Sequence, residues 1–428
     1  MESEIDQAAE SPADLPRVIR RNTILLAIFM GLGWGVVQLI ATLAAPVLSD
    51  LTGRAALAGV APAIFLGSWA VATLVTGRYM DVRGRGPGIR AGFLAAAAGC
   101  VLMYFGIRER SLALFVPGLA FSGGGLGAVN VARTGAADMY PPERRARGIS
   151  FVLVGAAFGA ILGPVAFIPL LARSGTDLAV LADPVAAAGV AMLVGATTTV
   201  AIRIDPVVVA RRLRHRTATA DAADPSRSIR AMLDVPVVRV ALVAAVVAQA
   251  VMSSLMGTVA LILHDHGHGW PSVSISLSAH FLGMFGLVLV VGRLVDRVGR
   301  QRSLLVGFAV LAAGSLGLLW RIEVGSVAPA MFAVGVGWNL AYVAATAMMA
   351  DASIPLERAR LLGFSDFVAL GTGAAAAALA GVVFGTLGLG ALAGISAAAS
   401  LIPVVLFLRN RPTRRAGVLR LTPTEPRC

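Results

Sequence analysis

The sequence predicts an all-α membrane protein with twelve transmembrane helices in two six-helix halves. The first observation is composition: 57% of the 428 residues are hydrophobic, 14% are charged, and the mean hydropathy is +0.82. A chain this apolar has to be solvated by lipid. The second is a series of twelve apolar runs long enough to cross a bilayer. The third is a motif that recurs half a chain later, as in a duplicated bundle.

The apolar runs fall into two groups of six, separated by a polar, arginine-rich stretch. The first group covers 22–48, 55–77, 91–107, 111–138, 149–171 and 184–202. The second covers 240–263, 273–291, 303–320, 327–350, 363–384 and 389–408. The expected units are a cytoplasmic N-terminal tail (1–21), an N-terminal six-helix bundle (22–204), a cytoplasmic linker (205–235), a C-terminal six-helix bundle (236–408) and a cytoplasmic C-terminal tail (409–428).

The distribution of arginine predicts the orientation. All 36 basic residues are arginines, and thirty of them share one face if both termini are cytoplasmic. Since arginine-rich loops stay inside, we expect a multi-pass protein of the cytoplasmic membrane with both termini in the cytoplasm. The net charge of +13 then lies beside membrane lipid, and no nucleic-acid partner is expected. The acidic start lacks a cleavable signal pattern, and Cys100 and Cys428 imply no disulfide framework.

Two loop motifs carry the internal repeat. Residues 77–85 read G-R-Y-M-D-V-R-G-R after the second span, and residues 292–300 read G-R-L-V-D-R-V-G-R after the eighth, 215 positions further on. The two copies share five positions, among them Gly77, Asp81 and Arg85 in the first copy and Gly292, Asp296 and Arg300 in the second. A weaker echo relates Asp138, Pro142, Glu143 and Arg144 to Asp351, Pro355, Glu357 and Arg358. The glycines permit close helix ends, and the charges can form charge-assisted contacts.

These tandem G-x-x-x-D-x-x-G-R loops resemble the signature of the major facilitator superfamily, and the resemblance covers essentially the whole chain. It implies the major facilitator fold and alternating access around a midplane site. It also implies that the two loops are a conformational latch that holds the outward-open state; the alternative is a static loop turn. We expect the protein to be a monomer. We also expect that it is not an enzyme and needs no cofactor, since the sequence has no phosphate-binding loop and no plausible catalytic dyad.

The fifth span carries small residues at helical spacing: Gly155, Gly159, Gly163 and then Pro164. This pattern predicts close helix packing with a kink near the end of the span. It also resembles the antiporter-associated motif of the same family. The glycine pair that should follow the proline is absent, so helix packing is the preferred interpretation.

Arg133 lies within the fourth span, where an unpaired guanidinium would be costly. It matches an arginine that the family often carries there, although the glutamine that frequently follows is missing. We therefore expect Arg133 to pair with a carbonyl or with ligand. Together with Asn130 and Asn339 it is the candidate substrate or coupling site.

Four potential metal ligands lie on two neighbouring spans. Met252 and Met256 are four residues apart in the seventh span, and His280 and Met284 repeat that spacing in the eighth. Each pair shares a helix face, at depths of about 10 and 16 Å from the expected outer ends. Thioether and imidazole donors without a carboxylate suit Cu(I). The alternative is ordinary methionine packing, although a histidine inside a span is by default a functional candidate.

A histidine-rich run follows the seventh span at its outer end. His264, His266 and His268 alternate with Asp265 and Gly267. Such a tract can capture a metal ion before it moves inward, and the alternative is a polar loop with a glycine turn. Four of the five histidines in the chain lie between His264 and His280, which favours a metal.

The Met-x-x-x-Met and His-x-x-x-Met pairs resemble those of the CcoA-like copper importers, which implies import of copper ion. A proton-coupled transporter of a drug, metabolite or flavin is the main alternative, with His280 able to exchange protons near neutral pH. Proton-driven exporters usually carry a buried carboxylate in one of their first spans. Spans one to three of this chain contain none, which disfavours an exporter. A non-transporting sensor is a third reading, which two retained latch loops disfavour.

Overall fold

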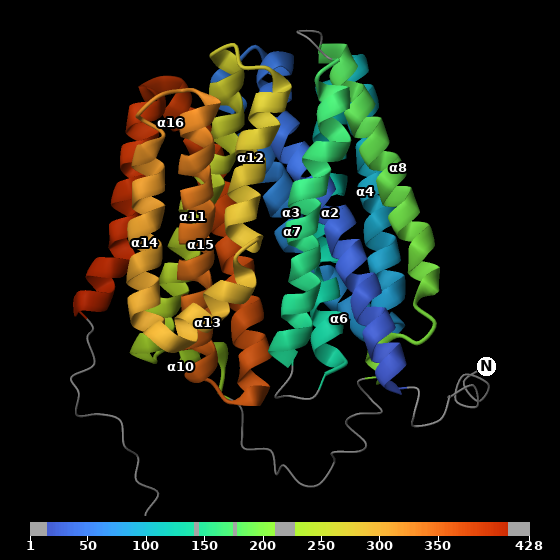
Figure 1. Ribbon diagram of the computed structural model, residues 1–428, viewed down its shortest axis with the longest axis vertical. Coiled ribbons are helices and arrows are strands. Elements are labelled where there is room, and N and C mark those ends of the chain that lie inside the picture. The colour runs from blue at the N-terminus through green and yellow to red at the C-terminus, as the bar shows by residue number, and fades with distance from the viewer. Residues whose placement is uncertain (1–14, 141–144, 174–177, 210–226, 410–428) are drawn as a thin grey trace, which may run out of the picture.

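The computed structural model describes residues 15–140, 145–173, 178–209 and 227–409. The described chain is a bundle of helices that run roughly parallel to one long axis (Figure 1). Helices α2 to α8 form one half, and helices α10 to α16 form the other. The predicted tails lie largely or wholly outside the described residues, as do residues 210–226 of the predicted linker.

The N-terminal half has six spans because each apolar run ends at a turn, a glycine or a charged loop. Its helices are α2 (Leu15–Thr52), η1 (Ala55–Leu57), α3 (Val60–Arg83), α4 (Arg85–Arg108), α5 (Leu112–Asn130), α6 (Ala132–Asp138), α7 (Arg145–Leu171), η3 (Leu178–Leu181), α8 (Ala182–Thr198) and η4 (Thr199–Ala201). Gly84 separates α3 from α4 at φ +100°, a left-handed conformation that glycine adopts without strain. α5 and α6 together form the fourth span, with a break at Val131.

The C-terminal half repeats this plan. Its helices are α10 (Ile229–Leu233), α11 (Pro236–Asp265), α12 (Trp270–Phe285), α13 (Val288–Val298), α14 (Arg300–Gly317), α15 (Val324–Asp351) and α16 (Pro355–Arg409). Gly299 separates α13 from α14 at φ +95°, as Gly84 does in the other half. α16 contains two spans, because Gly388 interrupts it at φ +79°.

Twelve spans follow from these helices. Nine described helices are long and apolar enough to cross a membrane, and the bent pair α12 and α13 adds a tenth. The break at Gly388 divides α16 into two spans. The twelfth is α14, whose first turn carries Arg300, Gln301 and Arg302 and is therefore less apolar. The predicted all-α fold with two six-helix halves is confirmed.

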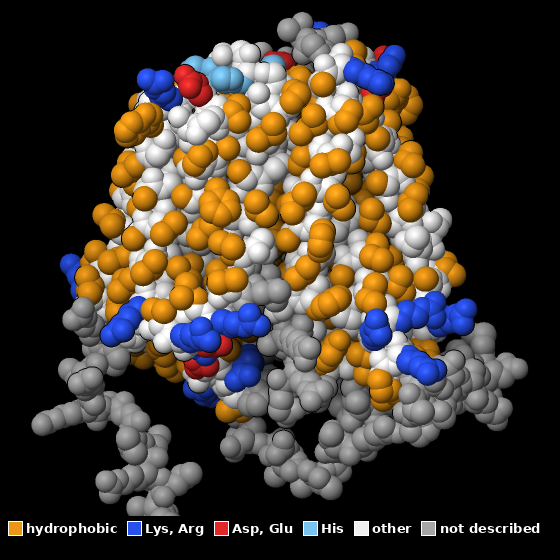
Figure 2. All heavy atoms as spheres, viewed as in Figure 1, with side chains coloured by type: hydrophobic (Ala, Val, Ile, Leu, Met, Phe, Trp, Pro, Cys, Tyr) orange, Lys and Arg blue, Asp and Glu red, His pale blue; other side chains and the backbone are white. Residues whose placement is uncertain are grey.

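The surface of the bundle has an apolar middle and two polar ends. Figure 2 shows hydrophobic side chains over the middle of the visible face, arginines gathered at the lower end and histidines at the upper end. Many large apolar side chains in the middle are exposed, among them Val75 (64%) and Val165 (67%). A belt of exposed apolar side chains is stable where hydrocarbon covers it.

Contacts between the halves are closest near the histidine-bearing end. Gly59, just before α3, lies against α16, where a Cβ on Gly59 would stand 2.8 Å from the backbone nitrogen of Gly381 and would overlap the carbonyl oxygen of Ala377. A Cβ on Gly257 of α11 would meet Pro62 of α3 at 2.7 Å. Small residues therefore close this end of the bundle by backbone-to-backbone packing.

Candidate substrate site between the two halves

An aromatic cluster joins the two halves near the middle of the bundle. Trp34, midway along α2, packs edge-on against Phe281 at 5.8 Å and Phe285 at 4.5 Å, both on α12, between ring centroids. Its ring also lies 5.7 Å from Trp69 of α3, which in turn contacts Phe65. Such edge-to-face and tilted arrangements present both ring edges and ring faces to a neighbouring ligand. The cluster is therefore suited to a flat apolar group.

A polar contact crosses the halves one turn from Trp34. The Gln38 side-chain amide donates to the carbonyl oxygen of Ser274 at 3.1 Å, to its hydroxyl at 3.0 Å and to the hydroxyl of Ser278 at 3.2 Å. Gln38 is fully buried, so these bonds connect α2 and α12 in a region shielded from water. The amide oxygen of the same side chain has no partner among the described residues.

Buried polar side-chain atoms on several helices lack partners in the described part of the chain. Besides the Gln38 amide oxygen, they are the Trp34 indole nitrogen, His280 Nε2, the Ser303 hydroxyl, the Asn339 amide nitrogen and the Ser365 hydroxyl. A buried polar atom without a partner costs about 1–3 kcal/mol, so such atoms are rare unless a ligand or water satisfies them. Except for Ser303 on α14, these atoms lie on α2, α12, α15 and α16, and their position indicates a binding site between the two halves.

The Asn339 amide belongs to this site through the packing of α15 on α12. A Cβ on Gly335 would meet the backbone nitrogen of Met284 at 3.0 Å, so this face of α15 touches α12. Asn339 lies four residues beyond Gly335 and therefore on the same face, one turn further along. Asn130, the other asparagine expected at the site, is the last residue of α5.

An ion pair forms on the arginine-rich side of this site. Arg133 Nη2 on α6 lies 2.9 Å from Asp366 Oδ2 on α16, and the Tyr342 hydroxyl on α15 donates to the other carboxylate oxygen. The Tyr342 ring stacks on Trp338 with centroids 4.9 Å apart, and the Trp338 indole donates to Gln249 at 3.1 Å. Arg133, which we expected to pair with a carbonyl or with ligand, instead pairs with a carboxylate of the other half.

Asp366, Tyr342 and Trp338 are not among the site residues predicted from the sequence. Asp366 lies six residues after Arg360, where the apolar span begins. Tyr342 and Trp338 have the i, i+4 spacing of one helix face, which was a readable signal. What sequence does not show is that α6 and α16 approach each other from opposite halves.

The predicted metal ligands are all buried, but their neighbours differ. The His280 Nδ1 atom lies 3.1 Å from the carbonyl oxygen of Met331 on α15. Met256 lines a small apolar cavity with residues of α2 and α3, including Val37 and Phe65. Met252 and Met284 belong to the hydrophobic core. Among the described residues no three His, Cys, Asp or Glu side chains form a group that could hold a metal.

The three histidines that follow the seventh span contact three different segments. His264 stacks on Trp270 with centroids 4.4 Å apart, and its Nε2 atom lies 4.0 Å from Asp50 of the other half. His266 Nδ1 lies 2.8 Å from the carbonyl oxygen of Ile262. His268 Nε2 lies 2.6 Å from that of Ile322. Each ring therefore has a structural contact of its own.

The loop motifs form matching ion pairs within each half. Arg85 contacts Asp138 through Nη2 at 3.0 Å, and Arg300 contacts Asp351 through Nε at 3.3 Å as well as Asp296. In both halves, the last arginine of the repeated loop motif thus pairs with the aspartate of the weaker repeat, Asp138 or Asp351. The Asp81 side chain lies outside the described residues. Gly77 and Gly292 have open space where a Cβ would stand.

The glycines of α7 lie against α2. A Cβ on Gly155 would overlap the carbonyl oxygen of Ala27, and one on Gly159 would stand 3.0 Å from the backbone nitrogen of Gly35. Gly163 follows one turn later, where a Cβ would come within 3.3 Å of the Gln38 amide oxygen. The next residue, Pro164, lies inside α7. This glycine seam brings α7 close to the helix that carries Trp34 and Gln38.

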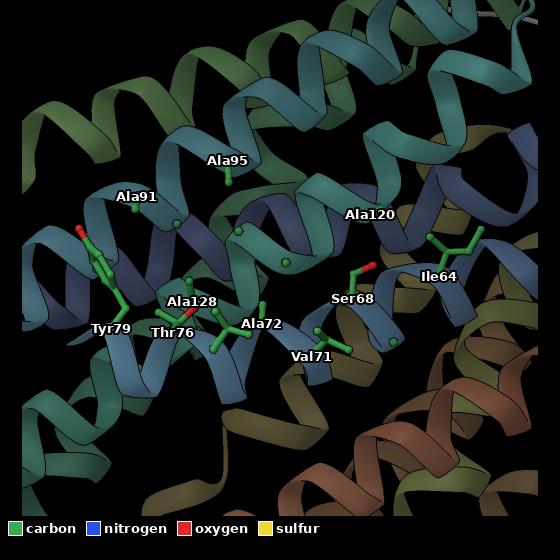
Figure 3. Close-up of a pocket in the computed structure, with 16 residues that line it drawn as sticks. Ile64, Ser68, Val71, Ala72, Thr76, Tyr79, Ala91, Ala95, Ala120 and Ala128 are labelled. Atoms are coloured by element: carbon green, nitrogen blue, oxygen red, sulfur yellow. The ribbon is translucent and has the colours of Figure 1, made fainter. Parts of the chain in front are cut away.

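A separate groove lies on the N-terminal half. It has a volume of about 820 Å³ and is lined by α3, α4 and α5. Figure 3 shows mainly small and apolar side chains along it, among them Ala72, Ala91, Ala95 and Val71. It contains no charged side chain and nothing from the other half. Its polar lining is limited to the hydroxyl groups of Ser68, Thr76 and Tyr79. Because only one half lines it, the groove is unlike a transport site that lies between two halves.

Comparison with known proteins agrees with this architecture. The family model described as Major Facilitator Superfamily matches residues 23–364 and 241–425. The chain is 28% identical over 399 residues to the riboflavin transporter RfnT of Brucella anthropi, which covers 93% of this chain and 98% of that protein. It is 27% identical over 401 residues to the uncharacterized MFS-type transporter YddS of Bacillus subtilis, covering 90% and 89%.

Solved structures share the fold. A partially occluded, inward-open xylose transporter XylE from E. coli superposes with a TM-score of 0.68 at 14% identity, over 94% of this chain and 100% of that one. A POT family transporter in complex with a thioalcohol-conjugated peptide gives 0.66 at 13% identity, over 91% and 96%. Because the family model covers both halves and these folds agree, the chain belongs to the Major Facilitator Superfamily and is a membrane transporter, not an enzyme.

Proposed function

We propose that this protein transports a small organic solute with a flat ring system, of the flavin class, through the site between its halves. Trp34 carries this proposal: its ring contacts α12 of the opposite half, and its buried indole N–H has no partner among the described residues. A flavin ring offers a flat face to aromatic side chains and carries carbonyl oxygens and ring nitrogens that accept hydrogen bonds.

The unpartnered groups of Trp34, Gln38 and Asn339 match the hydrogen-bonding groups of such a ring in type. The Trp34 indole and the Asn339 amide nitrogen are donors, and the Gln38 amide oxygen is an acceptor. A flavin ring has acceptors for the donors and one ring N–H for the acceptor. The similarity to a protein named as a riboflavin transporter supports the same class of solute.

The test is counterflow of radiolabelled riboflavin in proteoliposomes that contain the purified protein. Counterflow needs only a binding site that alternates between the two faces, so it is independent of any coupling ion. We expect exchange by the wild type, little or none by Trp34→Ala, and normal exchange by Trp320→Ala, whose side chain is 83% exposed. Excess xylose should not compete. If the wild type neither exchanges riboflavin nor binds it saturably, the proposal is wrong.

Copper ion is the second candidate solute, and one observation favours it. The Nδ1 atom of His280 contacts a backbone carbonyl, whereas the buried Nε2 atom has no partner among the described residues. Metal-ligating histidines commonly bond through one nitrogen and donate the other N–H to a carbonyl. Met284 shares the helix face of His280. Met252 and Met256 of α11 would complete the set only after a rotation of α11, because Met256 lines a cavity with residues of α2 and α3.

Measuring the copper content of cells distinguishes the copper hypothesis from the flavin hypothesis. A strain lacking this protein should recover its copper on complementation with wild type but not with the variant in which Met252, Met256, His280 and Met284 are alanine, if copper is the solute. On the flavin proposal, cellular copper is the same in all strains. The histidines His264, His266 and His268 then serve the closed outer end rather than metal capture.

We further propose that the arginine-rich end of the bundle faces the cytoplasm. The two loops at that end, 77–85 and 292–300, then act as the latch of the outward-open state. Import would proceed from the histidine-bearing end, through the site at Trp34, to the arginine-rich end. Protons are the proposed coupling ion, and the monomer contains the whole pathway because both halves lie in one chain.

A further inference from the structure

Asp366 is the deepest carboxylate in the described helices. Every other acidic residue of a described helix lies within two residues of that helix's end, whereas Asp366 lies eleven residues after Pro355, where α16 begins. The apolar span begins at Arg360, so Asp366 is about 9 Å inside it. An ionisable side chain at this depth is expensive to keep and indicates a function.

Both oxygens of the Asp366 carboxylate are engaged. Oδ2 accepts from Arg133 at 2.9 Å and Oδ1 accepts from the Tyr342 hydroxyl. Arg133 on α6 and Tyr342 on α15 are the titratable or charged side chains that contact it among the described residues. This pattern of one cation and one neutral donor stabilises the charged carboxylate and depends on its being charged.

The contact with Arg133 crosses from one half to the other. Arg133 follows the break in the fourth span, and Asp366 lies in the eleventh, so the halves cannot separate here while the pair is intact. The two side chains are 35% and 30% exposed, so water can reach the pair. An ion pair that is both a cross-half contact and open to water can be broken by adding a proton.

We propose that Asp366 is the proton-coupling residue of the transport cycle and that its pair with Arg133 is the inner gate. A proton from water binds Oδ2, which neutralises the carboxylate and releases the Arg133 guanidinium. The inner ends of α6 and α16 then part, and the solute site opens to that side. Loss of the proton to water restores the charge, and the pair forms again. This inference rests on the proposed transport function of the same site.

The gate adjoins the solute site through an aromatic contact. Tyr342 stacks on Trp338, and the Trp338 indole donates to Gln249 of α11, which donates to Ser253 at 3.2 Å. The residue after Trp338 is Asn339, whose amide is one of the unpartnered donors of the site. Solute at Asn339 and a proton at Asp366 therefore act on the same segment of α15.

The experiment compares two modes of transport in proteoliposomes: riboflavin counterflow, and net riboflavin accumulation driven by an imposed pH gradient of either sign. We expect Asp366→Asn to keep counterflow within about twofold of wild type and to lose gradient-driven accumulation, because a permanently neutral side chain cannot carry a proton. Asp366→Glu should restore part of the accumulation. Asp234→Asn, which removes an exposed carboxyl outside the spans, should retain both activities.

Wild-type counterflow without any response to the pH gradient would overturn the coupling role of Asp366 and leave the proposed function intact. The same follows if Asp366→Asn accumulates riboflavin as the wild type does. Absence of wild-type counterflow would instead count against the proposed function.

A measurement without solute tests the gate in either case. Spin labels at the inner ends of the halves, on Val82→Cys and Arg302→Cys in a Cys428→Ser background, report their separation. The separation should increase on acidification in the wild type. In Asp366→Asn the separation should not change with pH, because the side chain at position 366 can neither gain nor lose a charge. A separation that still increases on acidification in Asp366→Asn would contradict the gate.

Discussion

At the scale of single residues, the unpartnered indole of Trp34 is the sharpest test of the solute site. Trp34→Phe keeps an aromatic ring against Phe281 and Phe285 but removes the N–H donor. We expect it to weaken riboflavin binding by roughly 5- to 30-fold, the loss of about 1–2 kcal/mol for one hydrogen bond. Equilibrium binding of labelled riboflavin to detergent-solubilised protein measures this. Unchanged affinity would show that the indole N–H does not contact the solute.

A second residue-scale prediction concerns the ion pair between Arg227, at the end of the linker, and Glu357 of α16. Arg227 bonds Glu357 through its backbone nitrogen at 2.7 Å and its guanidinium at 2.8 Å, and the Glu357 side chain is 1% exposed. The hydrogen bonds from Arg227 lower the pKa of Glu357 from 4.5 to about 2. A carboxyl whose pKa is lower in the folded state stabilises the folded protein at pH values above its pKa in the unfolded state. This contribution is lost as the pH falls through its pKa in the folded state.

The stability difference between the wild type and Arg227→Gln should therefore be largest above pH 4.5 and shrink as the pH falls toward 2. Thermal unfolding of the two proteins at pH 7 and near pH 3 measures it. Glu323→Gln, which changes an exposed carboxyl at the opposite end, is the matched control. A difference that is the same at both pH values would exclude the Glu357 contact as its source.

At the scale of helices, close packing at the histidine-bearing end depends on glycine. Gly59→Ala places a methyl group against the carbonyl oxygen of Ala377 and within 2.8 Å of the Gly381 backbone nitrogen, so α3 and α16 must move apart. Backbone overlap of this kind costs about 1–3 kcal/mol or more. We expect a loss of riboflavin counterflow of at least roughly tenfold, because the histidine-bearing end cannot close.

Gly371→Ala is the control for this variant, because a Cβ at Gly371 of α16 meets nothing within 4 Å. It should exchange riboflavin at the wild-type rate. Thermal unfolding of both variants distinguishes a blocked closure from a protein that no longer folds. Normal counterflow by Gly59→Ala would mean that the two helices do not meet at Gly59 during transport.

At the scale of the whole molecule, the asymmetry of charge predicts the orientation in the membrane. A cysteine in place of Glu109, between α4 and α5, should react with an impermeant maleimide on intact cells. A cysteine in place of Arg302, at the start of α14, should react only after the cells are opened. Both variants carry Cys428→Ser, and the remaining Cys100 is buried. The reverse pattern would place the arginine-rich end outside.

Most of the architecture was readable from the amino-acid order. Spans are predictable because a helix that crosses lipid must be continuously apolar over a bilayer's thickness. The repeat at 77–85 and 292–300 indicated two halves, and the structure adds that its arginines pair with Asp138 and Asp351. The weaker repeat, which contains Asp138 and Asp351, thus supplies the partners of the loop-motif arginines. Sequence spacing alone does not reveal this pairing.

The site was less predictable. Arg133 was predicted because a lone guanidinium in a span needs a partner, but its partner Asp366 was not. The methionine pairs share helix faces as expected, yet Met256 faces α2 and α3 while His280 contacts α15. Periodicity shows which residues share a face of one helix, but it does not show which neighbour that face meets.

The sequence by itself determined the spans, the duplication, the charged ends and the family, because each depends on local composition or on a short motif. Only the tertiary structure decided that Trp34 meets Phe281 and Phe285, and that Arg133 meets Asp366. These partners lie more than 200 positions apart and come from opposite halves. Their contact depends on how the two bundles dock, and that docking is what alternating access changes.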